Sequence, residues 1–552
     1  MKKLFISAAA VALLSACGGN NTDADVEDVV ESGTNAAVDS AQRALEDLGN
    51  ITLRSGDAGQ AANALAAMSL SDSGSGRISF AGSNTDGDGA TFTDVAISVP
   101  DDDGDEGGQI LVGTLEFDGL DMVDGEASFS KMSMTDIRLV PNDPEDAEEG
   151  ELTVDNVELL NPSPALAAWV ASLTGNEAPG KFPTGADLSF DAMTLSNMNF
   201  SLEDGSDTVD FDLGNIQFLG ASETGVGVAK IEGVNLNAAS KGEDPVMLRL
   251  GSISMTGIGE KVMNAMQEGF EAGLENADPM ASQGLMEAIY ADPLEPGYDS
   301  MLIDDVAFEM GGVDFTLPSL AATVQRNSDG QAVGNVTEPF TMTLSADAEA
   351  GKTGAELAGM LGMLGYEQLT LTGAGKTTIN PETDTVIYDA SENYYTLEDG
   401  FTLRFGADMS GISEYSRKLA AMDLDDPSPD PAMLQDAASE LVFSQLTIQF
   451  EDDSIVDRAF NLYAAQSGED PAAVRQQAVS MIQLAPMMAA GAGVDMTIVT
   501  EFTTAAAAFL QEPGTLTISL DPQEPLSMAT FENIQDPSMI TKDMLGLSVT
   551  HE

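Results

Sequence analysis

A six-residue pattern recurs along this chain and constrains its fold more than any other feature. An apolar residue is followed by two small or polar residues, an apolar residue, any residue and another apolar residue. Three near-copies, FSKMSMTDI, FDAMTLSNM and LGSISMTGI, begin at residues 129, 190 and 250, and further copies begin at residues 92, 154, 213, 231, 303, 366 and 443. The recurrence predicts a repetitive body built from many similar strands.

The spacing within the pattern predicts strands that are not regular. In a regular strand, residues i and i+3 point to opposite faces, whereas residues i+3 and i+5 share a face. A β-bulge between the first two apolar positions would bring all three to one core, and the intervening Asp, Asn and Gly tolerate a distorted backbone. A two-residue hairpin turn is the alternative, best suited to the DN, GN and EG pairs. We predict bulged or bent long strands, with Phe190, Met193 and Leu195 on one apolar face.

The wider pattern indicates the fold class. Segments of period two, such as RISFAG and QILVGTLEF, begin at Arg77 and are separated by acidic, glycine-rich loops that suit antiparallel neighbours. Helical periodicity interrupts them in PALAAWVASLTG, in GEKVMNAMQEGFEAGLENAD, near residues 355–364 and near residues 412–422. We expect a β-rich α+β fold: an elongated antiparallel sheet of repeated, bulged long strands with helical inserts and a smaller α+β C-terminal unit.

The C-terminal region changes character after the segment LDDPSPDPAML. Strand SQLTIQF leads to a helix for which Ser454 and Asp457 predict a capping box. The positions of that helix predicted to face inward are Val456, Phe460 and Tyr463. Asp470 is the expected cap of a second helix, and a third, alanine-rich helix should end at Glu512-Pro513-Gly514 before TLTISLDP returns to strand.

These patterns divide the chain into eight segments. They are a lipoprotein signal peptide (1–17), an acidic tether (18–33), an N-terminal helical segment (34–76), antiparallel β repeats (77–258), a helical insert (259–295), a second β segment (296–410), a helical linker (411–440) and an α+β C-terminal unit (441–552).

The first seventeen residues, MKKLFISAAAVALLSAC, have the form of an export signal. Two lysines precede an apolar run that is too short to be a stable membrane-spanning anchor. The run ends in Leu14-Ser15-Ala16-Cys17, which resembles the lipobox of bacterial lipoprotein precursors, and Cys17 is the only cysteine. The resemblance implies that Cys17 becomes the acylated first residue of the mature protein. An ordinary export signal with a chance cysteine is the alternative.

The residues after the cysteine bear on localisation. Gly18 and Gly19 follow Cys17, whereas an aspartate there is the inner-membrane retention cue of lipoproteins in enteric bacteria. We therefore expect a protein of the cell envelope that is lipid-anchored in the outer membrane. Whether it faces the periplasm or the cell surface stays open.

Two further resemblances point to the envelope. The series FEDDSIVDRAF, DPAAVRQQ and FLQEPGTLTISLDP, within the C-terminal fifth, is similar to the end of uncharacterised exported proteins of alphaproteobacteria. It implies an envelope setting and brings no catalytic residues. The repeated strand pattern also resembles strands of AsmA-type envelope lipid-transfer proteins.

Charge and residue inventory exclude several classes of chemistry. A formal net charge of -71 repels phosphate backbones, so no nucleic-acid partner is expected. The only histidine is His551, expected at a frayed chain end, and no Cys/His zinc set exists. Ser128-Phe129-Ser130-Lys131 has the spacing of a serine–lysine dyad, but in a strand that spacing points the side chains apart. We predict no catalytic residues and no cofactor.

The acidic loops are weak candidates for a metal site. Asn84 to Gly89 imitates the start of a calcium loop but lacks its final glutamate. Asp101, Asp102, Asp103 and Asp105 are able to hold a hard cation loosely, although a solvated hairpin tip explains them as well.

The expected function is that of a non-catalytic scaffold or binding protein of the envelope. Its expected partners are the membrane, through the lipid anchor, and an envelope protein or lipid. The alternatives are a carrier of lipid or another apolar ligand with a β-lined groove, and an acidic-site hydrolase.

Overall fold

The chain forms two compact units. The computed structural model describes residues 51–74, 77–100, 106–141, 151–175, 183, 187–204, 207–241, 244–262, 296–420, 431–489, 495–527, 530 and 539–552. Among the described residues, the N-terminal unit takes those from 51 to 264 and 300–311, and the C-terminal unit takes 296–299 and those from 312 to 552.

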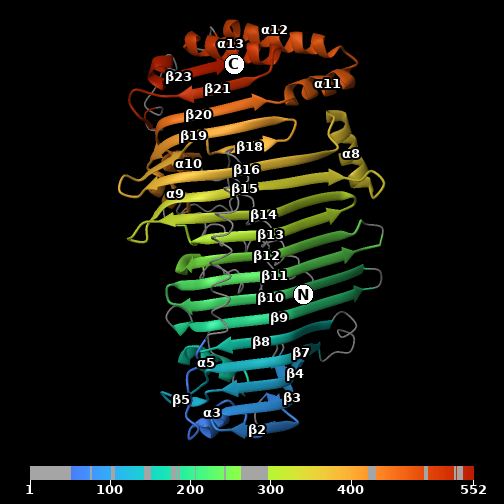
Figure 1. The fold of residues 1–552 in the computed structure, drawn as a ribbon, viewed down its shortest axis with the longest axis vertical. Coiled ribbons are helices and arrows are strands. Elements are labelled where there is room, and N and C mark those ends of the chain that lie inside the picture. The colour runs from blue at the N-terminus through green and yellow to red at the C-terminus, as the bar shows by residue number, and fades with distance from the viewer. Residues whose placement is uncertain are drawn as a thin grey trace. The chain divides into compact units, whose positions relative to one another are not determined.

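The N-terminal unit is built on an antiparallel sheet (Figure 1). Its strands are β1 (Ile78–Ser79), β2 (Gly82–Asp86), β3 (Gly89–Pro100), β4 (Glu106–Asp118), β7 (Lys131–Pro141), β8 (Glu151–Leu160), β9 (Phe190–Asp204), β10 (Asp207–Ser222), β11 (Gly225–Ala239), β12 (Val246–Gly259) and β13 (Ser300–Met310). From β3 to β13 each of these strands pairs with the next, and β1 and β2 both pair with β3. The small hairpin β5 (Asp121–Val123) and β6 (Glu126–Ser128) contacts helices α3 (Ala61–Ala67) and α5 (Pro164–Ser172).

The C-terminal unit combines antiparallel strands with a helical layer. Its strands are β14 (Val313–Arg326), β15 (Ala332–Ala346), β16 (Gln368–Asn380), β17 (Thr385–Tyr388), β18 (Tyr394–Leu397), β19 (Phe401–Ser410), β20 (Val442–Asp452), β21 (Thr515–Leu520), β22 (Leu526–Ser527) and β23 (Leu547–His551). Its helices are α8 (Lys352–Leu364), α9 (Ile412–Ala420), α10 (Pro431–Ala438), α11 (Ile455–Ser467), α12 (Pro471–Ala489), α13 (Met496–Gln511) and α15 (Lys542–Leu545). The predicted β-rich α+β class with antiparallel pairing is confirmed.

Most of the helices expected from periodicity are present. α3, α5, α8 and α9 coincide with predicted helices, and α13 ends directly before Glu512-Pro513-Gly514. Asp470 caps α12 as predicted, because its Oδ1 accepts the Ala472 N–H at 2.8 Å. Residues 34–50 of the predicted N-terminal helical segment and residues 263–295 of the predicted helical insert lie outside the described residues.

Two predictions about α11 are wrong. Ser454 precedes the helix but caps nothing with its side chain, because its hydroxyl donates to the Asp399 carbonyl. The Asp452 carboxylate instead accepts the Val456 N–H at 2.9 Å. Tyr463 is exposed rather than inward, since α11 buries Ala464 and contacts α8 and α12 through other positions.

One row of residues crosses the N-terminal sheet without taking part in strand pairing. This row, here called the break row, consists of Asp94, Gly113, Asp136, Asp155, Asn197, Gly214, Gly233, Gly251 and Asp305. The register is the same on both sides of it: Thr93 pairs with Thr114, and Val95 pairs with Val112. Alternate members, namely Asp94, Asp136, Asn197, Gly233 and Asp305, have φ of 52°, 54°, 50°, 66° and 54°.

The break row explains the copies of the six-residue pattern that begin at residues 92, 154, 213, 231, 250 and 303. Each of the nine strands β3, β4 and β7 to β13 carries one extra residue at the same level, so the register is kept while the alternation of faces shifts by one residue. Phe92 and Val95 are both buried, and so are Ile303 and Val306, although each pair is separated by three positions. The predicted shared face is confirmed for these copies, but it arises from an extra residue in both paired strands at unchanged register and not from a β-bulge in one of them. The hairpin alternative is wrong because the DN, GN and EG pairs lie inside β8, β10 and β11.

Glycine is required at the break row where a neighbouring side chain comes close. A Cβ on Gly113 would lie 2.8 Å from the Cβ of Asp136, and one on Gly251 would lie 2.9 Å from the Cβ of Asp305. Asp, Asn and Gly also occupy the positive-φ positions, since these residues tolerate the left-handed region best.

A second unpaired row crosses β9 to β12 six positions away. It consists of Asp191, Gly220, Gly227 and Gly257, again with constant register and with positive φ in alternate strands. By the same geometry Phe190 and Met193, on either side of Asp191, share one face of the sheet. The equivalent pair Phe129 and Met132 supports this, because the Phe129 ring contacts Phe117, the cross-strand partner of Met132.

The chain segment before α3 crosses the face of the sheet opposite the one that Phe190 and Met193 share. Ile51 packs against a buried cluster of Leu160, Ala192, Leu219 and Val228. The Asn161 side chain holds the segment by accepting the Arg54 N–H at 3.0 Å and donating to the Thr52 carbonyl at 3.0 Å.

The left-handed backbone at Asp136 gives the first testable prediction. Asp136→Val should lower the free energy of unfolding by about 1–3 kcal/mol, because a β-branched side chain is strained at φ of 54°. Asp136→Gly should change it by less than about 1 kcal/mol. Thr135→Val, at the neighbouring regular position, is the matched control. Urea unfolding measures all three, and equal losses for valine and glycine would contradict the assignment of strain.

A buried carboxylate in β15 gives a prediction on pH dependence. Glu338 is 8% exposed, next to an irregularity in the pairing of β15 with β16, and burial raises the pKa of its carboxyl group. The folded state therefore binds this proton more tightly than the unfolded state. Stability associated with Glu338 is lost as the pH rises from the unfolded pKa through the folded one.

Glu338→Gln should accordingly raise the melting temperature at pH 7, and the gain should vanish when the pH falls below the ordinary glutamate pKa. Glu349→Gln, at an exposed position in the turn after β15, is the control and should have no effect. Melting curves recorded at a series of pH values test this. A gain that is independent of pH would show that ionisation of Glu338 is not the cause.

Candidate functional site

The N-terminal sheet carries four complete rows of apolar residues, which together we call the apolar face. Each row joins β3, β4, β7, β8, β9, β10, β11, β12 and β13 through cross-strand partners. The rows are Ala90, Phe117, Met132, Leu159, Met193, Phe218, Ala229, Met255, Met301; Phe92, Leu115, Met134, Val157, Leu195, Ile216, Ile231, Ile253, Ile303; Val95, Val112, Ile137, Val154, Met198, Leu213, Val234, Leu250, Val306; and Ile97, Ile110, Leu139, Leu152, Phe200, Phe211, Leu236, Leu248, Phe308.

The break row is what places these four rows on one face. Two rows lie on each side of it, and without the extra residue the two pairs of rows would point to opposite faces. Every one of the nine strands contributes four residues, and none of the contributed side chains contains a nitrogen or oxygen atom. The face offers dispersion and hydrophobic contact and no hydrogen bonds.

Burial varies along the apolar face. In the outer strands its members are buried, as Leu115 and Ile303 are. In the central strands the members of the same row, Leu195, Ile216 and Ile231 among them, are only half-buried, and Met193 is 37% exposed. The centre of the face is therefore partly accessible in the rows through Met193 and Leu195, whereas Leu213, Val234 and Leu250 in the next row are buried.

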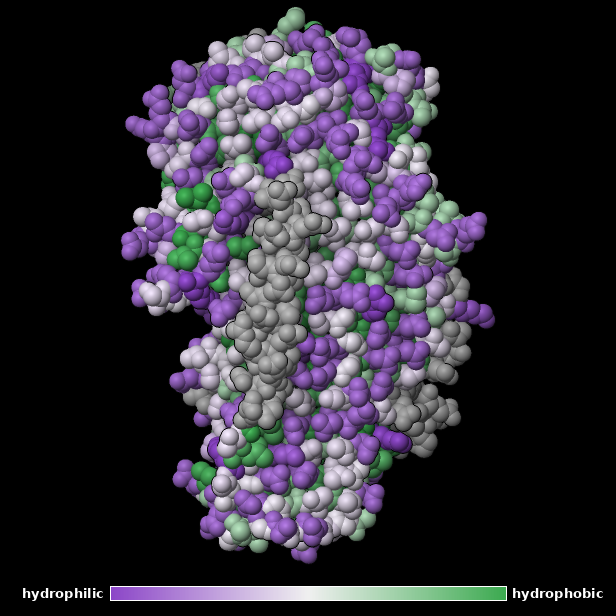
Figure 2. Space-filling model, in the orientation of Figure 1, coloured by the Kyte–Doolittle hydropathy of each residue, from purple (hydrophilic) through white to green (hydrophobic). Residues whose placement is uncertain are grey.

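The rows between the apolar ones face the other side and are mainly Thr, Ser, Asn, Gln and Glu. Lys131 forms ion pairs there with Glu116 at 3.3 Å and Glu158 at 3.7 Å, and Lys230 pairs with Glu232. Figure 2 shows hydrophilic residues over the strands of the N-terminal unit on the face in view. One side of the sheet is thus hydrated and the other apolar.

The break row itself carries exposed carboxylates. The Asn197 side chain donates to Asp155 at 2.9 Å, and Arg249 pairs with Asp305 at 2.8 Å. Among the described residues there is no group of three or more His, Cys, Asp or Glu side chains that could hold a metal ion. The weak candidates Asp101, Asp102, Asp103 and Asp105 lie outside the described residues, as does Cys17.

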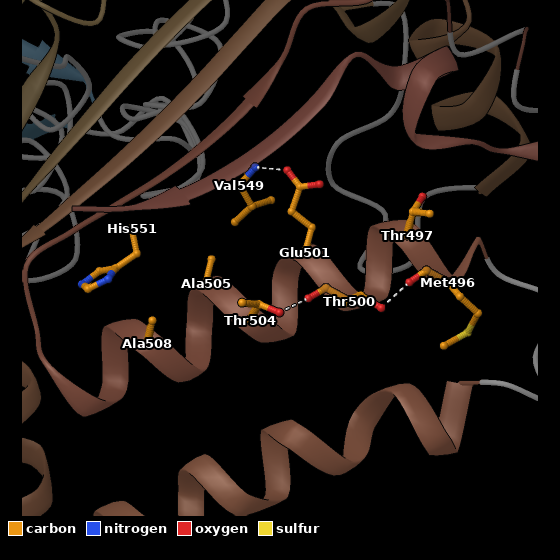
Figure 3. A pocket seen from close by; sticks show the side chains of 9 residues that line it. All are labelled: Met496, Thr497, Thr500, Glu501, Thr504, Ala505, Ala508, Val549 and His551. Carbon is orange, nitrogen blue, oxygen red and sulfur yellow. Dashed lines mark hydrogen bonds between the residues drawn. The ribbon is translucent and has the colours of Figure 1, made fainter.

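The C-terminal unit has a groove of about 660 Å³ between α13 and strand β23 (Figure 3). Its lining consists of Met496, Thr497, Thr500, Glu501, Thr504, Ala505, Ala508, Val549 and His551. The Thr500 and Thr504 hydroxyls each donate at 2.6 Å to a carbonyl of their own helix. The groove is therefore lined mostly by methyl groups and small side chains.

Glu501 is the one carboxylate in the groove lining, and its partners neutralise it. It forms an ion pair with Lys542 and accepts the Val549 N–H at 2.9 Å. These hydrogen bonds, that of Lys542 first, hold the pKa of Glu501 below its usual range. An engaged carboxylate of lowered pKa is a poor general base, so the groove resembles a docking surface more than an active site.

His551 does not lie at a frayed end, contrary to expectation. It pairs with Leu516 in the ladder between β23 and β21, and its ring lies 6.0 Å from that of Phe509. Its Nε2 is buried and has no hydrogen-bond partner among the described residues. Tertiary pairing of β23 orders the segment that the sequence position alone marked as loose.

The serine–lysine spacing corresponds to no dyad. Ser128 ends β6 and Lys131 begins β7, where its ammonium group is held by carboxylates. The Ser130 hydroxyl donates to the Asp118 carbonyl at 3.1 Å.

None of the described helices is both long enough and apolar enough to span a membrane.

Comparison with known proteins reaches only the C-terminal part of the chain. A family model described as "Uncharacterized protein" matches residues 394–552, from β18 to the end of β23. No curated protein matches the chain. The predicted similarity of the C-terminal region to an uncharacterised family is thereby confirmed at that level, and this similarity brings no activity or site residues.

Proposed function

We propose that this protein is a non-catalytic, lipid-anchored binding protein of the bacterial cell envelope, and that its ligand is an acyl chain of a lipid or another elongated apolar molecule. The observation that supports this best is the apolar face, four uninterrupted rows of apolar residues, of which the rows through Met193 and Leu195 are partly accessible at their centre. Sugars, nucleotides and charged metabolites find no hydrogen-bonding group on it.

The dimensions of the face suit this class of ligand. Strands lie about 4.8 Å apart, so a row that crosses nine strands is roughly 38 Å long. A membrane hydrocarbon core of about 30 Å is filled by two opposed layers of acyl chains, so one chain fits within a single row. Methionine is frequent on the face, and its flexible, polarizable side chain adapts to ligands of varied shape.

The envelope setting rests on the leader and the lipobox-like Leu14-Ser15-Ala16-Cys17. Several acyl chains on Cys17 would give durable attachment to the outer membrane, since a single chain binds only reversibly. An anchored protein with an apolar sheet face is well placed to take up lipid from the same membrane. A scaffold whose apolar face is merely a packed core is the alternative.

A substitution at Met193 distinguishes a lipid-binding apolar face from one that is only a packed core. Met193→Asp should lower the amount of lipid that co-purifies with the protein several-fold. Its cost in stability should be below about 2 kcal/mol, because the side chain is already partly exposed. Mass spectrometry of lipids extracted from the purified full chain measures the first effect, and urea unfolding the second.

Met247→Asp is the matched control. Met247 is 41% exposed in β12 and lies one position from Leu248, on the hydrated side of the same sheet. It should leave bound lipid unchanged. If both variants retain the wild-type amount of lipid, the apolar face is a structural core and the scaffold interpretation replaces the carrier.

The anchor makes a separate prediction. In cells fed labelled palmitate, the wild-type chain should incorporate the label and Cys17→Ala should not, because Cys17 is the only cysteine available for acylation. The variant should also appear in the soluble fraction of the envelope. Absence of label from the wild-type chain would remove the basis for the anchored localisation.

A further inference from the structure

Helix α12 in the C-terminal unit presents an exposed apolar surface that the proposed function does not use. Met481, Leu484, Met487 and Met488 are 60%, 52%, 77% and 82% exposed. Met481, Leu484 and Met488 follow helical spacing i, i+3, i+7 and therefore form one stripe, with Met487 beside it. We call these four residues the α12 patch.

The opposite side of α12 is committed to the fold. Val479 is buried there, and the helix packs on α13 and α11. Arg475, the only charged residue of α12, donates to the Leu510 carbonyl at 3.0 Å, pairs with Asp457 and lies 5.0 Å from the centre of the Phe460 ring. The charge of this arginine is thus used within the unit, and the outward side of the helix is neutral.

The absence of charge on the outward side of α12 is unusual in this chain, and it indicates what kind of partner the α12 patch binds. One residue in six is acidic (92 of 552), yet α12 contains no acidic residue and α13 contains only Glu501. In Figure 1 the two helices lie together at the end of the unit that also carries the C-terminus. The surface lacks the charge that repels the protein from lipid headgroups elsewhere.

We propose that the α12 patch docks on the surface of an uncharged, zwitterionic lipid bilayer, with its methionine and leucine side chains among the acyl chains. Methionine is also frequent at protein interfaces, but the residues that anchor such interfaces most strongly are Trp, Tyr and Arg, and the patch contains none of these. The apolar half of the helix is its C-terminal half, where Pro486 interrupts the backbone hydrogen bonding. A helix with one packed and one apolar exposed side suits the plane of a membrane interface.

A fluorescence experiment on the full chain tests this. In a Cys17→Ala background, a polarity-sensitive dye is attached at position 488 through Met488→Cys. Vesicles of phosphatidylcholine are then added. The emission should shift to the blue, and the shift should persist in 1 M salt because the patch carries no charge. Vesicles containing phosphatidylglycerol should bind less well, since the rest of the protein is strongly acidic.

Two controls localise the effect. The same dye attached through Met363→Cys on α8, where the native methionine is 56% exposed, should show no shift. Met481→Gln combined with Leu484→Gln should weaken the vesicle affinity of the protein labelled at position 488 by roughly tenfold or more, because two anchoring side chains become polar.

The outcomes are distinct from those of the carrier test. No shift at position 488, an equal shift at position 363, or full binding by the glutamine variant would each overturn docking by the α12 patch. Met193→Asp should leave the shift unchanged, so failure of one proposal does not imply failure of the other.

Discussion

The arrangement of the N-terminal unit depends on one backbone constraint, the left-handed residue that recurs in alternate strands along the break row. A single β-bulge would shift the register of one strand pair and misalign everything beyond it. When all nine strands carry the extra residue at the same level, the shift cancels between neighbours and the sheet continues. The constraint is therefore collective, and Asp94, Asp136, Asn197, Gly233 and Asp305 satisfy it with the residue types that bear positive φ most easily.

The chemistry of the apolar face follows from that backbone. With regular strands, Val95 and Phe92 would point to opposite sides, and each face would be a mixture of apolar and polar rows. Because of the extra residue, the four apolar rows all lie on one side of the sheet. The other side carries Thr, Ser and ion pairs such as that of Lys131 with Glu116. A sheet with one hydrated and one apolar side then has to bury the apolar side or offer it to a ligand. The half-exposed centre around Met193 is consistent with the second outcome.

Sequence reasoning reached the fold class, the shared face of the repeated pattern and the cap at Asp470, because these depend on local periodicity and on residues that act within one turn. It missed the copies VGTLEF, MTDIRL and LSNMNF, at residues 112, 134 and 195, whose alignment with the others shows that the break is a continuous row. That alignment is a property of cross-strand register, which no single strand encodes. The capping box at Ser454 failed for a similar reason, since a distant carbonyl, that of Asp399, competes for the hydroxyl. The order of His551 likewise comes from its pairing with Leu516.

Charge separates the two candidate lipid-facing surfaces from the rest of the molecule. With a net charge of -71, most surfaces of this chain are kept away from anionic membranes and from one another, which favours solubility. The apolar face of the sheet and the α12 patch are both free of charged side chains. They differ in geometry, because the first is an extended surface that matches single acyl chains and the second is a convex helix side that matches a bilayer interface. A protein that combined both would hold lipid on one unit and touch a membrane with the other, and its acidic remainder would limit that contact to the uncharged surfaces.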